Sequence, residues 1–249
     1  MAQLFSLGVV AMKKVLVDIF QSWRNEYSLM SDIAGDRFLE KANPGQQHSL
    51  SHLEKVVMIV LVFSRSFSLS HLAGALSGYT ARSHFSEGYV VAWFLTLSSL
   101  LALWPGATFA AGLGAYRVID SFTYRLCVLF VDRYQAGWGL RSVNRAIILA
   151  FINYLELMIG FAIIYVWSGS IASGDPPHAH VLSGSIEALY FSCVTVATIG
   201  YGDFTPRNSL GQGLVIAEVL MGILLLGLVL AALLSGIKNI NSLRDDHDA

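Results

Sequence analysis

Two long apolar segments, Val143–Trp167 and Leu210–Ile237, are the features that most constrain how this chain can fold. Each is longer than the roughly 20 residues that an α-helix needs to cross a lipid bilayer. The interior of the second segment, from Val219 to Leu234, contains no charged residue. We therefore predict that both segments cross a membrane as helices.

The composition of the whole chain also fits a membrane protein. Of its 249 residues, 55% are hydrophobic and 13% are charged. Soluble domains carry about 25% charged residues, so roughly half of the usual charge is missing. The net charge of −1 gives no field that would attract a polyanion. These values exclude a disordered chain and a nucleic-acid-binding surface, and they argue against most cytosolic enzymes.

A segment of a different kind lies between the two predicted spans. Its first part, Ser185–Ala197, is apolar but too short to cross a bilayer, which favours a re-entrant helix. Ser185 is the expected N-cap of this helix, and Glu187 suits the positive end of its dipole. The second part, Thr198–Asp203, contains two glycines that favour extended or left-handed backbone over helix.

Non-helical backbone at membrane depth is tolerated only where protein buries it or where it lines water. Its carbonyl oxygens need a partner, and rings of carbonyl oxygens can replace the hydration shell of a monovalent cation. In such a site one chain supplies one quarter of each ring, so four copies must surround a central axis. We therefore predict a homotetramer in the lipid bilayer.

The residues Thr-Ile-Gly-Tyr-Gly-Asp at 198–203 resemble the selectivity-filter signature of potassium channels. The order of outer helix, pore helix, filter and inner helix over Val143–Ile240 is similar to the pore domain of that family. This resemblance implies a potassium-selective ion channel that conducts K⁺ passively down its electrochemical gradient. It implies no enzymatic activity and no cofactor, with K⁺ as the permeant ion.

The resemblance also assigns roles to the residues of the filter. The implied K⁺ ligands are four carbonyl oxygens, with the Thr198 hydroxyl as a further one: Thr198, Ile199, Gly200 and Tyr201. Gly200 and Gly202 would permit the twist that points successive carbonyls inward. Ile199 replaces the commoner valine of the family, and Asp203 would lie at the outer mouth.

Further residues around the filter are assigned by the same resemblance. Thr195 matches the pore-helix threonine of the family, and Tyr190 and Phe191 resemble the aromatic residues that brace the filter from behind. Val194 stands where some members have a glutamate that pairs with the filter aspartate. The inactivation behaviour of those members is therefore not implied for this chain.

Charged residues inside the predicted spans need protein partners, because a charge in lipid is expensive. We predict that Glu218 faces the protein and supports the filter, and that it shares a hydrogen-bond network near the pore helix with Glu156. Arg117 and Arg125 are too few for a voltage sensor, because each charge contributes only about 2.3 kcal/mol per 100 mV. Arg117 fits a neutralising pair with Asp120 better.

Glycines interrupt the inner helix, and they have two interpretations. They can permit close helix packing in the membrane. Alternatively, Gly227 is the hinge for pore opening, followed by a hydrophobic gate that closes by dewetting. The candidate gate residues are Leu230, Leu233 and Leu234.

The chain before the pore divides into two regions. In residues 1–53, charges alternate with apolar residues at helical spacing, which indicates amphipathic helix on the membrane or on the cytosolic side, ending near Asn43-Pro44-Gly45. In residues 54–134 we predict a two-span hairpin, Gly88–Trp104 and Ala107–Val131. Before it, Glu54–Ser77 becomes polar after its first half, so we favour an interfacial or partial helix over a fifth full span.

The predicted architecture is an all-α integral membrane protein, in which a tetrameric pore module follows the helical hairpin and the amphipathic N-terminal helices. The pore domain covers 135–240, with outer helix 143–167, pore helix 185–197, filter 198–203 and inner helix 210–237, and 241–249 form a cytosolic tail. Basic residues flank the inner ends of the spans, which places both termini in the cytosol of a multi-pass protein of the plasma (inner) membrane. These residues are Arg82, Arg133, Arg141, Arg145, Lys238 and Arg244.

Other interpretations of the same residues remain open. A less selective cation channel and a non-conducting, channel-like modulatory subunit are the alternatives to a potassium channel. An enzyme is disfavoured, because His, Asp and Glu residues converge on no single span. His178 and His180 in the outer loop either respond to external pH or are ordinary solvated residues. Cys127 and Cys193 are interpreted as buried thiols rather than as a disulfide or a zinc site.

Overall fold

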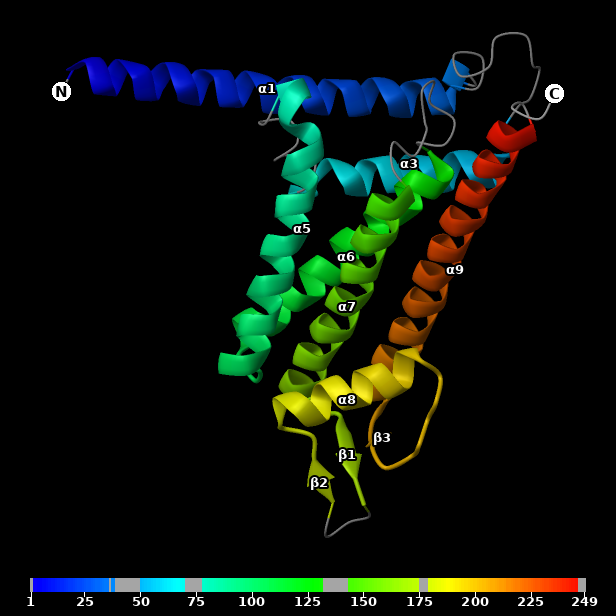
Figure 1. Ribbon diagram of the computed structural model, residues 1–249. Helices are drawn as coiled ribbons and strands as arrows, with labels where there is room; N and C mark the ends of the chain where they lie inside the picture. Colours follow the sequence, from blue (N-terminus) through cyan, green and yellow to red (C-terminus); the bar gives the residue numbers. More distant parts are fainter. Residues whose placement is uncertain are drawn as a thin grey trace. The chain divides into compact units, whose positions relative to one another are not determined.

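The structure, a computed structural model, describes residues 2–35, 37–38, 50–69, 78–131, 143–174 and 179–245. The chain divides into two compact units, one formed by Met1–Tyr89 with Thr123–Gly139 and the other by Val90–Phe122 with Leu140–Ala249. The elements follow one another along the chain as drawn in Figure 1. They are α1 (Ala2–Ala34), α3 (His52–Ser66), α5 (Gly78–Leu103), α6 (Thr108–Phe130), α7 (Val143–Ser168), β1 (Ile171–Ser173), β2 (His180–Val181), α8 (Ser185–Val196), β3 (Thr205–Pro206) and α9 (Ser209–Asp245).

Some of the predictions fall outside this description. The turn at Asn43-Pro44-Gly45 and the loop residue His178 are outside the described residues. The structure likewise does not describe the side chains of the basic residues that predict the orientation, nor those of two candidate gate leucines. These residues are Arg82, Arg133, Arg141, Arg145, Lys238, Arg244, Leu233 and Leu234.

In the first unit, α1 and α3 lie side by side (Figure 1). Apolar residues such as Ile33, Met58 and Val62 are buried there. Arg65 near the end of α3 donates to both carboxylate oxygens of Glu26 in α1, at 3.0 and 2.9 Å. An ion pair as well as apolar packing thus joins α1 and α3.

The α3 helix has 15 residues, fewer than the roughly 20 that a full span requires. It begins at a capping box, where the backbone N–H of Ser51 donates to the Glu54 carboxylate at 2.8 Å. It ends at Ser66, where the sequence has turned polar. Within the predicted segment 54–77, the last eight residues lie outside the described part of the chain.

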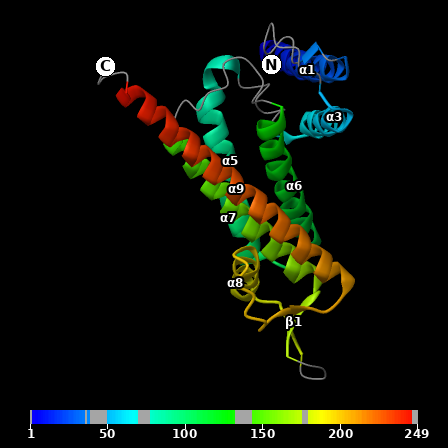
Figure 2. The same ribbon diagram turned by 90° about the vertical axis from the view of Figure 1, so that its right-hand side faces the viewer.

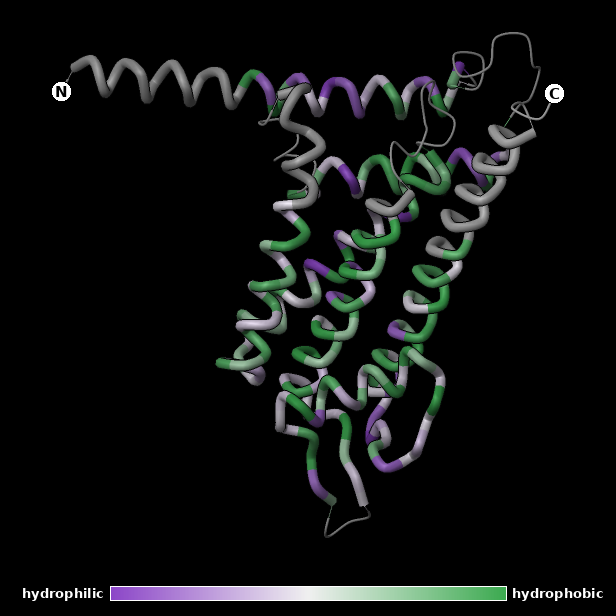
Figure 3. Tube along the Cα trace, in the orientation of Figure 1, coloured by the Kyte–Doolittle hydropathy of each residue, from purple (hydrophilic) through white to green (hydrophobic). Residues whose placement is uncertain are grey.

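The second unit contains the two helices that are apolar and long enough to cross a membrane among the described residues. They are Ile147–Ser168 within α7 and Ser209–Gly227 within α9, and Figure 3 shows that hydrophobic residues dominate both. The α7 helix covers the predicted outer helix, and α9 begins one residue before the predicted inner helix and continues to Asp245. The apolar part of α5, Gly88–Leu103, is shorter than a full span.

The helices α7 and α9 lie side by side, and α8 lies across one of their ends (Figures 1 and 2). The core between them contains fully buried residues such as Ile163, Tyr165 and Ala188. At the contact of α9 with the end of α8, a Cβ on Gly222 would overlap the side chain of Val196. Gly222 therefore lets the inner helix approach the pore helix closely, which supports the packing interpretation for this glycine.

The α6 helix also approaches α7 at a pair of glycines. A Cβ on Gly114 would lie 3.3 Å from the carbonyl oxygen of Gly160, and a Cβ on Gly160 would lie 2.6 Å from Val118. Small residues at a helix crossing allow close backbone contact, as in membrane helix pairs. The part of α6 in this unit is thereby packed directly on α7.

A three-stranded antiparallel sheet in the order β2-β1-β3 occupies the segments before and after α8 and the filter. Ala172 pairs with Val181 and also with Thr205, which places β1 at the centre. Most of the described residues lie in helices, as predicted, but the sequence analysis did not predict this sheet. Strands of two or three residues are too short to show a period of two.

Candidate functional site

The helix α8, which the sequence predicts to be re-entrant, begins one residue earlier than a Ser185 N-cap requires. The N-cap is Gly184, with extended φ and ψ of −80° and 139°, and Glu187 at the third helical position accepts a 3.4 Å hydrogen bond from the Gly184 N–H. Ser185 is the first helical residue, so its predicted N-cap role is wrong. Its hydroxyl instead donates to the carbonyl of Leu101 in α5 at 2.6 Å. Glu187 lies at the positive end of the helix, as predicted.

The end of α8 turns directly into the filter segment. The Thr198 N–H donates to the carbonyl of Thr195 at 2.9 Å, and the Ile199 N–H donates to the carbonyl of Val194 at 3.0 Å. These bonds use carbonyl groups that the end of a helix would otherwise leave without partners. Thr195 and Val194 thus anchor the first filter residues through their backbone.

The filter backbone has positive φ at every second residue. The φ angles are 56° at Thr198, 61° at Gly200 and 79° at Gly202. Glycine adopts this region readily, but a β-branched residue such as threonine is an outlier there. A Cβ on Gly200 or Gly202 would meet nothing within 4 Å in a single chain, so conformation rather than space requires glycine at both positions.

Aromatic side chains connect α8 to the filter and to the outer helix. The Tyr190 ring stacks on the ring of Tyr201 with centroids 6.5 Å apart and planes 5° apart. Phe191 lies between two rings, at 5.0 Å from Tyr165 and 6.5 Å from Phe204. Both predicted bracing residues therefore contact the filter segment or the residue that follows it.

Glu218 is fully buried behind the pore helix. One of its carboxyl oxygens accepts a 2.6 Å hydrogen bond from the Tyr165 hydroxyl on α7, and the other is bonded to the Ser192 hydroxyl on α8. The predicted support residue therefore contacts both neighbouring helices. Tyr165 and Ser192 were not among the predicted site residues, because single hydroxyls in apolar helices carry no distinctive spacing.

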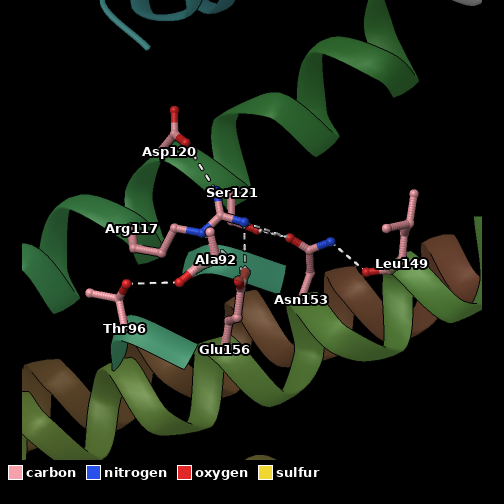
Figure 4. A network of polar contacts seen from close by, with 8 residues as sticks. All are labelled: Ala92, Thr96, Arg117, Asp120, Ser121, Leu149, Asn153 and Glu156. Atoms are coloured by element: carbon pink, nitrogen blue, oxygen red, sulfur yellow. Dashed lines mark hydrogen bonds and ion pairs between the residues drawn. The ribbon is translucent and has the colours of Figure 1, made fainter. Parts of the chain in front are cut away.

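Glu156 belongs to a separate network, so the predicted sharing of one network with Glu218 is wrong. Arg117 donates to one oxygen of Glu156 at 3.0 and 2.7 Å and to Asp120 at 3.1 Å, and the side chains of all three residues are almost fully buried (Figure 4). Asn153 accepts from Arg117 at 3.2 Å and from Ser121 at 2.9 Å. The expected pairing of Arg117 with Asp120 is confirmed.

The candidate hinge lies in a continuous helix. The α9 helix runs without interruption through Gly227, and a Cβ there would meet no atom within 4 Å. Unlike Gly222, this glycine makes no close packing contact within the described part of the chain. Leu230 exposes 53% of its surface, as a residue facing a pore, lipid or another copy would.

The outer sheet is tied to the start of α8 by one side-chain pair. His180 in β2 lies 3.2 Å from the Glu187 carboxylate, and its ring is 6.5 Å from Phe204. The hydrogen bond with His180 holds the pKa of Glu187 below its ordinary value of 4.5. His180 is therefore paired rather than simply solvated, although its side chain remains 55% exposed.

Residues 153–238 match the family model described as "Ion channel". This match covers α8, the filter and most of α7 and α9, which are the elements that position the site. Residues 153–238 are therefore similar to the ion-channel family over the elements that position the candidate site. The matched family consists of channels and not of enzymes, and the two helices that flank residues 198–203 are long and apolar enough to cross a membrane.

Similar proteins come from several organisms, and all three named here are potassium channels. Two-pore potassium channel 1 of Arabidopsis thaliana is 36% identical over 31% of this chain and 22% of its own length. The hyperpolarization-activated voltage-gated potassium channel of Methanocaldococcus jannaschii is 29% identical over 42% of this chain and 57% of its own length. The voltage-gated potassium channel of Aeropyrum pernix is 23% identical over 72% of this chain and 58% of its own length. The chain thus spans less than two thirds of the length of each relative.

Proposed function

We propose that this chain forms a homotetrameric, potassium-selective channel that conducts K⁺ passively through a filter at residues 198–203. The observation that carries the proposal is the alternation of positive φ at Thr198, Gly200 and Gly202, directly after a re-entrant helix. In an ordinary strand, successive carbonyls point to opposite sides. Alternating left-handed residues bring them to one side, where they can replace the water around a cation.

The exposed surface of the single chain supports assembly around an axis. Ile199 and Tyr201 in the filter expose 54% and 67% of their surface, and Ile186 at the start of α8 exposes 85%. Large apolar side chains so exposed beside a cation pathway call for protein cover, which other copies would provide. Four copies would complete the rings of carbonyl oxygens from Thr198 to Tyr201.

The proposed orientation places the filter end of α7 and α9 at the outer face of the plasma (inner) membrane and both termini in the cytosol. The basic residues that flank the predicted spans support it through the positive-inside rule. Single cysteines in the β1–β2 loop and in the C-terminal tail test it. An impermeant thiol reagent applied from outside should label only the first, and labelling of the tail alone would reverse the orientation.

Purified protein in liposomes tests the function. We expect K⁺ flux that barium blocks, and a reversal potential that follows the K⁺ gradient and not the Na⁺ gradient. A reversal potential set by both ions would indicate a less selective cation channel. Absence of flux from correctly assembled protein would leave a channel-like modulatory subunit.

A pair of glycines provides the matched test of the filter. Gly200 and Gly169 have nearly equal φ angles, 61° and 58°, but Gly169 lies outside the filter, after α7. Gly200→Ala and Gly169→Ala should therefore impose similar backbone strain, about 1–2 kcal/mol each. We expect only Gly200→Ala to abolish K⁺-selective flux, and equal losses in both variants would contradict the proposed filter.

A further inference from the structure

The carboxyl group of Glu218 lies in a closed set of polar contacts contributed by three helices. The Tyr165 hydroxyl on α7 is 2.6 Å from Oε2, and the Ser192 hydroxyl on α8 is bonded to Oε1. The Ser192 oxygen is also 2.9 Å from the backbone carbonyl oxygen of Met158 on α7. Glu218 and Ser192 have no exposed surface in the single chain, so neither lipid nor another copy can reach them.

These contacts can be counted against the hydrogens that the groups supply. Tyr165 and Ser192 each bring one hydroxyl hydrogen, whereas an ionised carboxylate and a backbone carbonyl only accept. Two hydrogens cannot serve the three contacts: Tyr165 with Glu218, Ser192 with Glu218, and Ser192 with Met158. With an ionised carboxylate, one pair of oxygens would lie within bonding distance with no hydrogen between them.

One additional hydrogen on Oε1 of Glu218 completes the set. Glu218 then donates to the Ser192 oxygen, Ser192 donates to the Met158 carbonyl, and Tyr165 donates to Oε2. Every contact has one donor and one acceptor, and the buried polar atoms involved are satisfied, as buried groups normally are.

Among the residues that the structure describes, no positive charge compensates Glu218. In the part of the chain that the structure describes, both side-chain partners of the carboxyl group are hydroxyls. The titratable groups that interact with it are Tyr154 and Tyr165 on α7 and Cys193 on α8, and none of these is ever cationic. A fully buried carboxylate without a cation is expensive, and neutralisation by a proton removes this cost.

We infer that Glu218 is a neutral carboxylic acid whose proton completes a hydrogen-bonded chain from α9 through Ser192 on α8 to Met158 on α7. Ser192 lies six residues before Thr198, on the helix that leads into the filter. Glu218 is therefore a positioning residue that holds the pore helix between the outer and inner helices. This positioning role rests on the proposed channel function, whereas the protonation state does not.

Infrared difference spectroscopy of the purified full chain tests the proton directly. The spectrum of the wild type minus that of Glu218→Gln should contain the carbonyl band of a neutral carboxylic acid at neutral pH. This band should shift on exchange into D₂O. The matched control is Glu187→Gln, whose exposed carboxyl should contribute only the bands of an ionised carboxylate. Carboxylate bands in the Glu218→Gln difference would overturn the inference.

The variant Tyr165→Phe tests the orientation of the acid. It removes the donor to Oε2, the carbonyl oxygen of the neutral acid, so the acid band should move to higher frequency without disappearing. A band that stays in place would show that Tyr165 does not donate to this group. Because Tyr165→Phe keeps Glu218, a shift of the acid band in this variant shows the proton on Glu218 even if Glu218→Gln fails to assemble.

K⁺ flux in liposomes tests the positioning role. The side-chain amide introduced by Glu218→Gln can donate to Ser192 and accept from Tyr165. This variant should therefore keep K⁺-selective flux of the wild-type order and should remove any loss of flux at alkaline pH. Glu218→Ala interrupts the hydrogen-bonded chain between α9 and α7, and this variant should lose selectivity for K⁺ over Na⁺. If Glu218→Gln loses selectivity as Glu218→Ala does, the ionised form is required and the inference is wrong. Absence of flux in the wild type would contradict the proposed function but not the protonated acid.

Discussion

The unit that contains α7, α8 and α9 has two buried polar networks that are built in opposite ways. Between α6 and α7, the guanidinium of Arg117 holds the carboxyl groups of Asp120 and Glu156 (Figure 4). Behind the pore helix, Glu218 has only the hydroxyls of Tyr165 and Ser192 as side-chain partners among the described residues. The first network is ionic and joins α6 to α7. The second is uncharged and joins the three helices around the filter.

The difference shows how a chain with few charges distributes them at membrane depth. A buried ion pair is strongly destabilised when one partner is removed, because the other charge remains. A neutral network loses only hydrogen bonds when it is changed, and its loss is smaller. An ionic contact therefore suits a fixed joint, whereas a neutral network close to residues 198–203 adds no fixed charge beside the proposed K⁺ pathway.

The largest expected effect follows from removing the cation of the ionic network. Arg117→Met leaves Asp120 and Glu156 buried without the guanidinium, and we expect a loss of about 3–5 kcal/mol in stability. The measurement is the temperature at which detergent-solubilised protein loses its monodisperse gel-filtration peak. The double variant Arg117→Met/Glu156→Leu should recover part of the loss, because it also removes one of the two carboxylates that Arg117 contacts.

A wild-type melting temperature in Arg117→Met would mean that the guanidinium does not hold the carboxylates, and the contrast between the two networks would fail. An equal loss in Arg117→Met and Glu218→Gln would also contradict it, since only the first variant is expected to leave a buried charge.

A second pair of variants tests the packing beside the neutral network. Gly222 lies one turn after Glu218 on the same face of α9, where a Cβ would overlap Val196. Gly222→Ala should therefore cost about 1–3 kcal/mol through overpacking. Gly227 has open space around it, so Gly227→Ala should be neutral or stabilising by up to about 1 kcal/mol through helix propensity.

The same pair separates packing from gating in electrical recordings. If Gly227 is the hinge, Gly227→Ala should lower the open probability while melting at the wild-type temperature or above. An unchanged open probability would exclude Gly227 as the hinge. Equal destabilisation of both variants would show that the two glycines do not differ in packing.

The sequence was sufficient for the helices around the candidate filter because the information that predicts them is local. Segment length predicted α7, α8 and α9, and the glycines at 200 and 202 have the positive φ that their residue type permits. The positive φ of Thr198 was not predictable, since threonine disfavours it and the bonds at the end of α8 hold it there.

Pairings between helices were harder to predict than the helices themselves. Glu156 and Glu218 have the same chemistry and both lie in predicted spans, so the sequence indicated that each needs a partner but not which one. Their separation depends on α6, which brings Arg117 to Glu156 and leaves Glu218 to the hydroxyls of α7 and α8. The N-cap of α8 differed by one residue, because Gly184 and Ser185 are both acceptable caps and φ and ψ decide between them.

Two buried serines, one in each network, sharpen the comparison further. Ser192→Ala removes the group that joins Glu218 to α8 and leaves one carboxyl oxygen without a partner, so we expect a loss of about 1–3 kcal/mol. Ser121→Ala should cost less, about 0.5–1.5 kcal/mol, because Asn153 still accepts from Arg117. Thermal unfolding of the two variants in one detergent measures the difference, and the reverse order would contradict the assignment of partners.

The smallest effect is expected at the exposed pair between His180 and Glu187, where water screens the interaction. Because the pKa of Glu187 in the folded chain lies below its ordinary value of 4.5, the pair stabilises the fold above that pH. This stability is lost as the pH falls through the lowered folded value. Glu187→Gln should thus melt slightly below the wild type at neutral pH, and the two melting temperatures should converge in acid. His180→Gln serves as the matched control, and a difference that persisted at a pH well below the lowered pKa of Glu187 would contradict the effect.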